Sequence, residues 1–199
     1  MIVGAGLDAR SVRIRHHTCF ELDFEGVLSA KRSLFAAAGF PIPPDAKLVA
    51  TDLSEGAERW SADLVSAGFD RSTRTTWVLE GLTSYLSQDE VDALLAGITK
   101  LSAPGTDVDP GSNIVATWIR PAKDANAGQP IVMKSGLHRT FFEDPSATLA
   151  RAGAWRLQSQ HSIEKCGAGL GVAVPTSPVG GGYWLTIHSL IVQKDSYKQ

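Results

Sequence analysis

Five short apolar runs with the character of strands alternate along the chain with segments whose apolar residues have helical spacing. The expected strands span residues 2–4, 18–22, 47–51, 75–79 and 113–119. This alternation is typical of an open parallel sheet with helices on both faces. Two further strand-like segments, 154–160 and 183–192, predict a closing hairpin and therefore an antiparallel last strand. We therefore predict an α/β fold whose sheet is mostly parallel.

Capping residues indicate where some of the helices begin. Ser87 and Glu90 have the spacing of a capping box, and an apolar stripe follows them. Asp144 followed by Pro145 predicts the start of a short helix that runs to Ala152. Both signals are local, so they place these helix starts without knowledge of the fold.

Three further segments are assigned from composition and spacing. Residues 24–38 predict a helix ending before Gly39, and Ser54 or a neighbour is expected to cap a helix that contains Trp60 and stops at Gly68. Residues 167–182 are rich in glycine and proline and predict a long loop. The first of these helices is expected to have an apolar face, made of Val27, Leu28, Leu34 and Phe35.

Length and composition predict one domain over residues 1–199 and limit its partners. The net charge is −2, so no basic excess argues for nucleic acid or an anionic membrane surface. Cys19 and Cys166 lack the spacing of a zinc or disulfide framework, so no metal is expected and a reducing compartment is favoured. We find no signal peptide or membrane-spanning run, and we expect a cytoplasmic protein. The sequence makes no prediction about oligomeric state.

Four of the predicted strands end in residues suited to binding a nucleotide. In a parallel sheet these carboxyl ends form one edge, where ligands bind. The turn Gly4-Ala5-Gly6 lets a ligand approach the backbone. Asp23 follows Gly6 by 17 residues, a spacing suited to a carboxylate that accepts hydrogen bonds from ribose hydroxyls. Asp52 with the Leu53 backbone is suited to an adenine edge, and Glu80 ends the fourth strand.

Four segments in this order also resemble a known family. They are residues 3–10 (VGAGLDAR), 20–24 (FELDF) with Lys31, 51–53 (TDL) and 77–86 (WVLEGLTSYL). Together they resemble the leucine carboxyl methyltransferase family, including its bacterial branch of S-adenosylmethionine-dependent O-methyltransferases. The resemblance is weaker from residue 103 onward. It implies a Rossmann-like class I methyltransferase sheet and S-adenosyl-L-methionine as the cofactor.

The resemblance also implies a role for each strand end. Gly4, Ala5 and Gly6 would lie against the methionine part of the cofactor, and Glu80 near its amino group. Asp23 would hold the ribose, while Asp52 and the Leu53 backbone would hold adenine. Carboxylates suit these ligand groups because all of them are hydrogen-bond donors.

The expected reaction is transfer of a methyl group to an oxygen atom of a small molecule or, as a second choice, of a protein C-terminus. A carboxylate acceptor is already ionised at pH 7 and needs no general base, whereas a hydroxyl acceptor needs one. The candidates for a catalytic residue are His138 and Tyr85. The competing interpretations are an exposed loop histidine and an aromatic residue that serves packing.

Two other functions remain open from the sequence. Family members carry a helical segment before the first strand that covers the cofactor, and we find no counterpart here, which predicts weakened cofactor binding or a degenerate, non-catalytic domain. An NAD(P)-dependent oxidoreductase is the other alternative. Ala9 in place of the third glycine, the closing strand pair and the lack of a Tyr-x-x-x-Lys pair all disfavour it.

Overall fold

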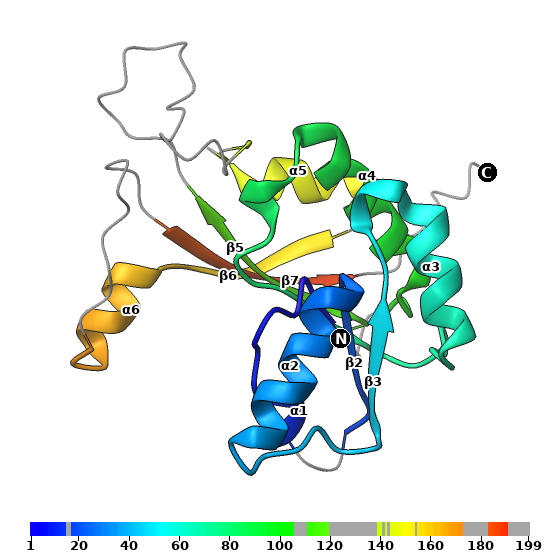
Figure 1. The fold of residues 1–199 in the computed structure, drawn as a ribbon. Coiled ribbons are helices and arrows are strands. Elements are labelled where there is room, and N and C mark those ends of the chain that lie inside the picture. The colour runs from blue at the N-terminus through cyan, green and yellow to red at the C-terminus, as the bar shows by residue number, and fades with distance from the viewer. Residues whose placement is uncertain are drawn as a thin grey trace.

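The computed structural model describes residues 1–14, 17–105, 111–119, 139–140, 142, 144–153, 155–172 and 183–190. The described strands form one seven-stranded sheet in the order β3-β2-β1-β4-β5-β7-β6 (Figure 1). Its strands are β1 (Ile2–Val3), β2 (Cys19–Asp23), β3 (Ala46–Ala50), β4 (Thr76–Leu79), β5 (Asn113–Ile119), β6 (Trp155–Ser162) and β7 (Tyr183–Leu190).

The prediction of a mostly parallel sheet with an antiparallel C-terminal strand is confirmed. The first five strands pair in parallel, because each connection between them crosses over one face of the sheet. The last strand, β7, runs antiparallel to both of its neighbours, β5 and β6. It lies between them, so the sheet does not end on the last strand of the chain.

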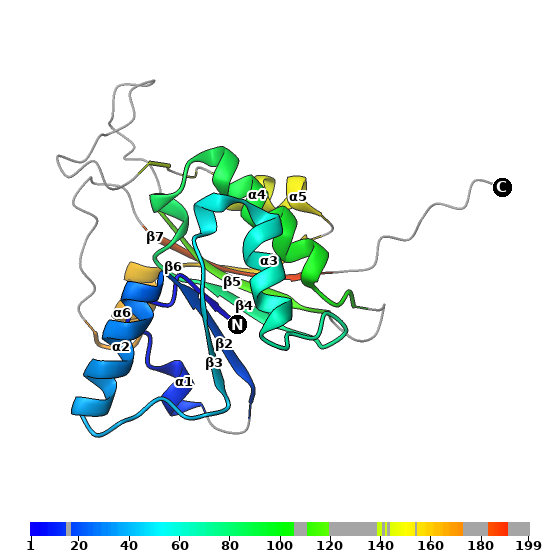
Figure 2. The ribbon, with the colours of Figure 1, turned by 45° about the vertical axis from the view of Figure 1, so that its right-hand side comes forward.

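The helices cover both faces of the sheet. Figures 1 and 2 show α3, α4 and α5 gathered on one side and α1 and α2 on the other, while α6 lies beside β6 and β7. The helices are α1 (Arg10–Arg13), α2 (Glu25–Ala37), α3 (Ala57–Ser66), α4 (Gln88–Leu101), α5 (Pro145–Ala152) and α6 (Ile163–Gly169), with 3-10 turns η1 (Leu53–Glu55) and η2 (Thr83–Tyr85).

The main core lies between the sheet and the side covered by α3, α4 and α5. Aromatic side chains fill much of it. The ring of Trp77 in β4 packs edge-to-face against that of Trp60 in α3, with 6.5 Å between the ring centroids. It is tilted against the ring of Phe69, with 5.6 Å between the centroids. Trp118 of β5 contacts Phe142 at 4.7 Å. Trp60, Trp77 and Trp118 are therefore packing residues, as their burial also shows.

On the opposite face, an ion pair lies completely buried between β2 and α2. Successive side chains of a strand point to opposite faces, so Phe20 and Leu22 enter the main core while Glu21 faces α2. There Lys31 Nζ donates to Glu21 Oε2 at 2.5 Å, and both side chains have no exposed surface. A charge in such a site is stable only when it is paired.

This ion pair corrects the predicted apolar face of α2. The helix buries Leu28 and Lys31, whereas Leu34 is exposed. Helical spacing alone selects Leu34, but the carboxylate on β2 sets which stripe faces the sheet. Gly39 lies just beyond α2 with φ at +81°, as predicted for a residue that ends a helix.

Some of the other predicted helix boundaries are confirmed, and others differ from the structure. The capping box of Ser87 and Glu90 is present with both hydrogen bonds, and the Asp144 carboxylate caps α5. The helix predicted to be capped by Ser54 or a neighbour is capped by Gly56, two residues after Ser54, which itself belongs to η1. The predicted loop 167–182 begins too early, since α6 continues to Gly169.

Within the described part of the chain, no helix has the length and apolar character that crossing a membrane requires.

Candidate functional site

The carboxyl ends of β1, β2, β3 and β4 meet at one edge of the sheet. The chain leaves β1 toward β2 on one side, and β4 pairs with β1 on the other. The strand order therefore reverses between β1 and β4, and such a switch point leaves a crevice for a ligand. All of the predicted cofactor residues that follow these strands are described by the structure.

The glycine turn after β1 uses its backbone N–H groups within the protein. Gly4 N and Ala5 N both donate to the Leu22 carbonyl, at 2.9 and 3.0 Å, and Gly6 N donates to the Asp23 carboxylate. Gly4 and Gly6 have φ of +69° and +46°, in the left-handed region that glycine adopts without strain. The turn thus follows the end of β2 closely and offers none of these three donors to a ligand.

Asp23 connects the first two strand ends. Its Oδ2 accepts from Gly6 N at 2.7 Å and its Oδ1 from Phe24 N at 2.8 Å. A carboxylate has about four acceptor positions, so roughly two remain for other donors. The two backbone bonds fix the direction of the side chain and tie it to the glycine turn.

Asp52 follows β3 and shapes the turn that contains Leu53. Its Oδ1 accepts from the Ser54 hydroxyl at 2.6 Å and from Ser54 N at 2.8 Å. These two hydrogen bonds hold the pKa of the Asp52 carboxyl below its ordinary value. Asp52 Oδ2 has no hydrogen-bond partner among the described residues, and it remains an acceptor at this edge.

Glu80 follows β4 and is joined to the turn after β1 through Arg10. Arg10 Nη2 contacts Glu80 Oε2 and also Asp8 Oδ2 at 2.7 Å, while Arg10 Nε donates to Asp8 Oδ1 at 3.1 Å. Burial alone would lower the pKa of the Arg10 guanidinium, but the hydrogen bonds and charges of Glu80 and Asp8 outweigh it and raise that pKa. This charged bridge spans the switch point.

The loop that carries Glu80 is held from the neighbouring strand. Gly81 N donates to Thr117 Oγ1 at 2.8 Å, and Thr83 Oγ1 donates to the Thr117 carbonyl at 3.0 Å. Farther along, Arg139 N donates to the Ser84 carbonyl at 2.6 Å. Arg139 and Thr140 therefore pack over the loop after β4 and support this side of the crevice.

The two candidate catalytic residues differ in what the structure shows. Tyr85 ends η2 and is 44% exposed, at the rim of the same loop. His138 lies outside the described residues. Among the described residues, no three His, Cys, Asp or Glu side chains form a group that could hold a metal.

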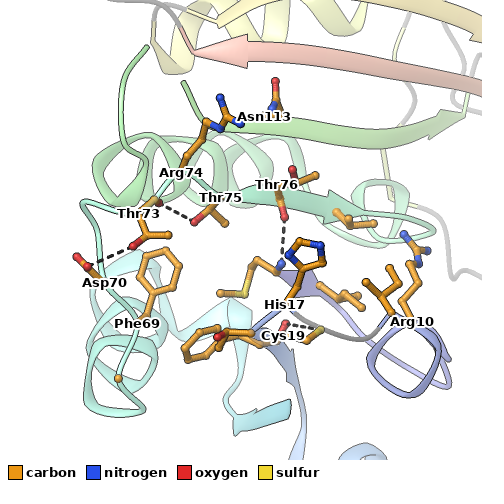
Figure 3. A pocket seen from close by; sticks show the side chains of 17 residues that line it. Arg10, His17, Cys19, Phe69, Asp70, Thr73, Arg74, Thr75, Thr76 and Asn113 are labelled. Atoms are coloured by element: carbon orange, nitrogen blue, oxygen red, sulfur yellow. Dashed lines mark hydrogen bonds between the residues drawn. The ribbon is translucent and has the colours of Figure 1, made fainter. Parts of the chain in front are cut away.

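A large cavity lies at the opposite edge of the sheet and is not the predicted site. It has a volume of about 760 Å³ and opens between the amino ends of β2, β4 and β5, near Cys19, Thr76 and Asn113 (Figure 3). Met1 and Thr76 are among its lining residues, and the Met1 amino group donates to the Thr76 carbonyl at 3.0 Å. Only Arg10 belongs to both the lining of this cavity and the charged bridge.

Sequence reasoning therefore located the strand ends but missed the links between them. The 17-residue interval between Gly6 and Asp23 was informative, and these two residues are hydrogen-bonded. The interval of 70 residues between Arg10 and Glu80 carries no local signal. A contact of this kind follows only from the order of the strands.

Solved structures with the same architecture are methyltransferases and related proteins. A protein titled as a putative methyltransferase from Thermobifida fusca aligns with a TM-score of 0.62 at 19% identity, over 96% of this chain and 72% of that one. The riboflavin-derivative dimethyltransferase RosA from Streptomyces davawensis aligns at 0.54 and 14%, over 95% and 48%. LepI in complex with S-adenosylmethionine aligns at 0.54 and 14%, over 95% and 42%. The fold is the Rossmann-like fold of class I methyltransferases.

The family follows from the sequence comparisons. Residues 1–99 match the family described as leucine carboxyl methyltransferase, and over this half the chain belongs to that family. A protein of Mycobacteroides abscessus named "Putative S-adenosyl-L-methionine-dependent methyltransferase" is 33% identical over 189 residues. A protein of the same name from Mycolicibacterium vanbaalenii is 42% identical over 111 residues, which are 53% of this chain and 34% of that protein. The first match covers 89% of this chain, which spans about 60% of that relative's length.

Proposed function

We propose that the chain binds S-adenosylmethionine at the carboxyl edge of the sheet and transfers its methyl group to an oxygen atom of a small molecule. The acceptor in this proposal is a carboxylate or a hydroxyl group. Membership in the leucine carboxyl methyltransferase family and the names of the relatives support the cofactor. The architecture shared with LepI, titled as a complex with S-adenosylmethionine, supports the same cofactor on this fold.

The charge of the site is the observation that carries the proposal. Four carboxylates, those of Asp8, Asp23, Asp52 and Glu80, share this edge with one guanidinium, that of Arg10. A net negative edge favours a cationic sulfonium and an ammonium group over an anionic ligand.

The glycine turn adds a second argument against a dinucleotide. A pyrophosphate is normally held by free N–H groups of such a turn and by a helix N-terminus. Here the N–H groups of Gly4, Ala5 and Gly6 are taken, and Asp8 accepts the N–H of Arg10 at the start of α1 at 2.7 Å. A phosphate would also meet the Asp8 and Asp23 carboxylates, so the NAD(P)-dependent alternative is disfavoured.

The proposed contacts follow the residues predicted from the sequence. The remaining acceptor positions of Asp23 suit two ribose hydroxyls, and Asp52 Oδ2 with the Leu53 backbone suits the adenine edge. Glu80 suits the ammonium group of the methionine part. Gly4, Ala5 and Gly6 form the surface beneath it, because they place no large side chain at this edge.

In this mechanism the protein acts by positioning. S-adenosylmethionine, when bound, would supply a methyl group on a positively charged sulfur; the acceptor oxygen would bond to the methyl carbon as the carbon–sulfur bond breaks, and S-adenosylhomocysteine would leave as a neutral thioether. The strand-end carboxylates orient the ligand, and the loop of residues 81–86, supported by Thr117, forms the adjacent wall. A carboxylate acceptor needs no proton removed at neutral pH. A hydroxyl acceptor requires a base, for which Tyr85 and His138 remain the candidates.

Thermal unfolding with added ligands tests the proposal. A ligand that binds the folded state raises Tm, so S-adenosylmethionine and S-adenosylhomocysteine are expected to stabilise the protein, while NADH and NADPH are not. Asp23→Ala should abolish the shift measured from its own ligand-free Tm. Asp45→Ala removes an exposed aspartate before β3 and should keep the full shift.

The results separate the alternatives. Stabilisation by NADPH alone would support the oxidoreductase, and no shift with any ligand would contradict the proposed cofactor site. A shift without methyl transfer to any acceptor in a panel of carboxylic acids and phenols would support a cofactor-binding domain without turnover.

A further inference from the structure

The first strand of the sheet leaves a gap between its two neighbours at the amino edge. β1 contains only Ile2 and Val3, and its pairing with both β2 and β4 begins at Ile2. β2 begins at Cys19 and β4 at Thr76, so both extend farther toward this edge. Neighbouring strands lie about 4.8 Å apart, so β2 and β4 are separated by roughly twice that distance, which is room for one strand segment. The large cavity lies in this gap, because Cys19, Thr76 and Met1 all line it (Figure 3).

Both walls of this gap, which we call the strand slot, present backbone N–H groups. In a parallel sheet, successive residues of a strand bond alternately to the strands on either side. The Leu22 carbonyl accepts from Gly4 N, so Phe20, two residues earlier, also directs its N–H toward the slot. The Thr76 carbonyl accepts from the Met1 amino group, so the Thr76 N–H faces the slot from β4. Within the described part of the chain, no strand pair reaches the N–H of Phe20 or Thr76 from this side.

Apolar side chains border the slot on both faces of the sheet. Alternate residues of a strand point to opposite faces. A residue entering beside Cys19 would therefore point to the α1 side, where Ile14 lines the cavity and is 49% exposed. The residue before it would point to the core side, toward Phe20 and Phe69. A segment that fits the slot is therefore apolar on both faces, as buried parallel strands are.

We propose that the strand slot binds the carboxyl end of an extended apolar peptide, which enters parallel to β2 and β4 and ends at Met1. The peptide carboxylate accepts from the Phe20 N–H, and the carbonyl before it accepts from the Thr76 N–H. Peptides bind other sheets in this way, through backbone hydrogen bonds to unpaired strand groups. This inference is independent of the proposed function, because the slot and the candidate site lie at opposite edges of the sheet.

The Met1 amino group determines which end of the peptide fits. It lies at the inner end of the slot, where it donates to the Thr76 carbonyl. Burial lowers the pKa of this amino group, and a carboxylate beside it would favour the charged form again. A peptide carboxylate therefore complements the inner end of the slot, whereas a peptide ammonium group would be repelled there.

Titration calorimetry with a synthetic peptide tests the proposal. The probe is acetyl-Lys-Thr-Val-Val-Val with a free carboxylate, and it is expected to bind. Proline in place of the middle valine of the three keeps the charge, and proline in place of the next valine removes an N–H inside the slot. The second of these peptides should bind at least about 10-fold more weakly than the first, because a strand N–H is lost. The carboxyl-amidated probe should bind about 10-fold more weakly than the free acid.

Hydrogen exchange locates the bound peptide. At saturation it should slow exchange of the Phe20 and Thr76 N–H groups by about 10-fold or more, because both gain a hydrogen bond. The Trp77 N–H follows Thr76 on β4 and therefore faces β5, so its exchange should not change.

Two substitutions and one extension complete the experiment. Ile14→Ser should weaken peptide binding about three- to tenfold through lost apolar contact. Val65→Ser is the matched control, because Val65 is 38% exposed on α3 and does not line the cavity. Joining Val-Val to the Met1 nitrogen by a peptide bond should fill the slot and abolish binding of the probe. The peptide-free Tm of each protein reports its folding.

The other outcomes overturn the proposal. These are no binding of the probe, equal binding of the two proline peptides, or binding that leaves the Phe20 and Thr76 N–H groups unprotected. Self-association that protects the same two N–H groups without peptide would assign the slot to a second copy of the chain and would also overturn it.

Discussion

At the scale of single residues, the two glycines of the first turn have different reasons to be glycine. Both have positive φ, which costs other L-residues about 1–2 kcal/mol. A Cβ on Gly4 would also lie 3.0 Å from Leu82 Cδ1, whereas a Cβ on Gly6 would meet nothing within 4 Å. Gly4 therefore serves the packing of the turn against the loop after β4, and Gly6 borders open space.

This difference predicts separable effects of two alanine substitutions. Gly4→Ala should lower the free energy of unfolding by about 2 kcal/mol or more, because backbone strain and the Leu82 contact add. Gly6→Ala should cost about 1 kcal/mol, yet it should remove the thermal shift with S-adenosylhomocysteine, because its methyl group enters the space we assign to the cofactor. Urea unfolding and thermal shift measure the two effects, and a Gly6→Ala variant with an unchanged shift would contradict the placement of the ligand.

At the scale of elements, the sequence predicted most strands and helices to within one or two residues. Periodicity and caps are local properties, so Asn113–Ile119 and Pro145–Ala152 were both located correctly. The error in α2 occurred where a distant partner decides the outcome, whereas the overlap of α6 with the predicted loop is a local error. The buried face of α2 depends on Glu21 of another element, and the packing of α3 on α4 depends on one glycine that looks like a defect in a helix.

That glycine, Gly97 in α4, makes room for Trp60 of α3. A Cβ there would lie 2.6 Å from the Trp60 ring. Gly97→Ala should therefore destabilise the protein by about 1–3 kcal/mol, although alanine favours a helix by about 1 kcal/mol.

Gly26→Ala is the matched control, because Gly26 lies in α2 with nothing within 4 Å of a Cβ. It should stabilise the protein by up to about 1 kcal/mol. Chemical denaturation measures both changes, and stabilisation by Gly97→Ala would show that α3 and α4 can separate without cost.

At the scale of the whole molecule, the amino and carboxyl ends of the strands form two edges of the sheet with different features. The amino edge holds the large cavity (Figure 3). The carboxyl edge collects the charged residues of the candidate site. The folding free energy depends on pH through the carboxylates that gain hydrogen bonds in the folded state. Asp52 and Glu90 are two of these, and their pKa values are lowered, for Asp52 chiefly by Ser54 and for Glu90 chiefly by the Ser87 N–H.

These lowered pKa values predict a loss of stability in acid. A carboxylate with a depressed pKa in the folded state stabilises the protein above its unfolded pKa, near 4, and loses this effect as the pH falls through the folded value. Urea unfolding midpoints should therefore fall between about pH 5 and pH 3.

A glutamine variant isolates the contribution of one carboxylate. Glu90→Gln should be less stable than the parent at pH 7 by about 1 kcal/mol or less, the size of a helix cap. The difference should shrink at pH 3, and a constant difference across this range would contradict the assigned role of the Glu90 charge.

The class of fold, the order of its elements and a set of candidate ligand-binding residues at the strand ends could all be predicted from the sequence. These candidates are Gly4, Gly6, Asp23, Asp52 and Glu80. These follow from short-range patterns, because helix and strand periodicity and the turns after strands are encoded within a few neighbouring residues. Only the tertiary structure decided which candidates touch. The bridge from Asp8 through Arg10 to Glu80 and the buried pair of Glu21 and Lys31 arise because sheet order and helix packing bring together groups that no local pattern relates.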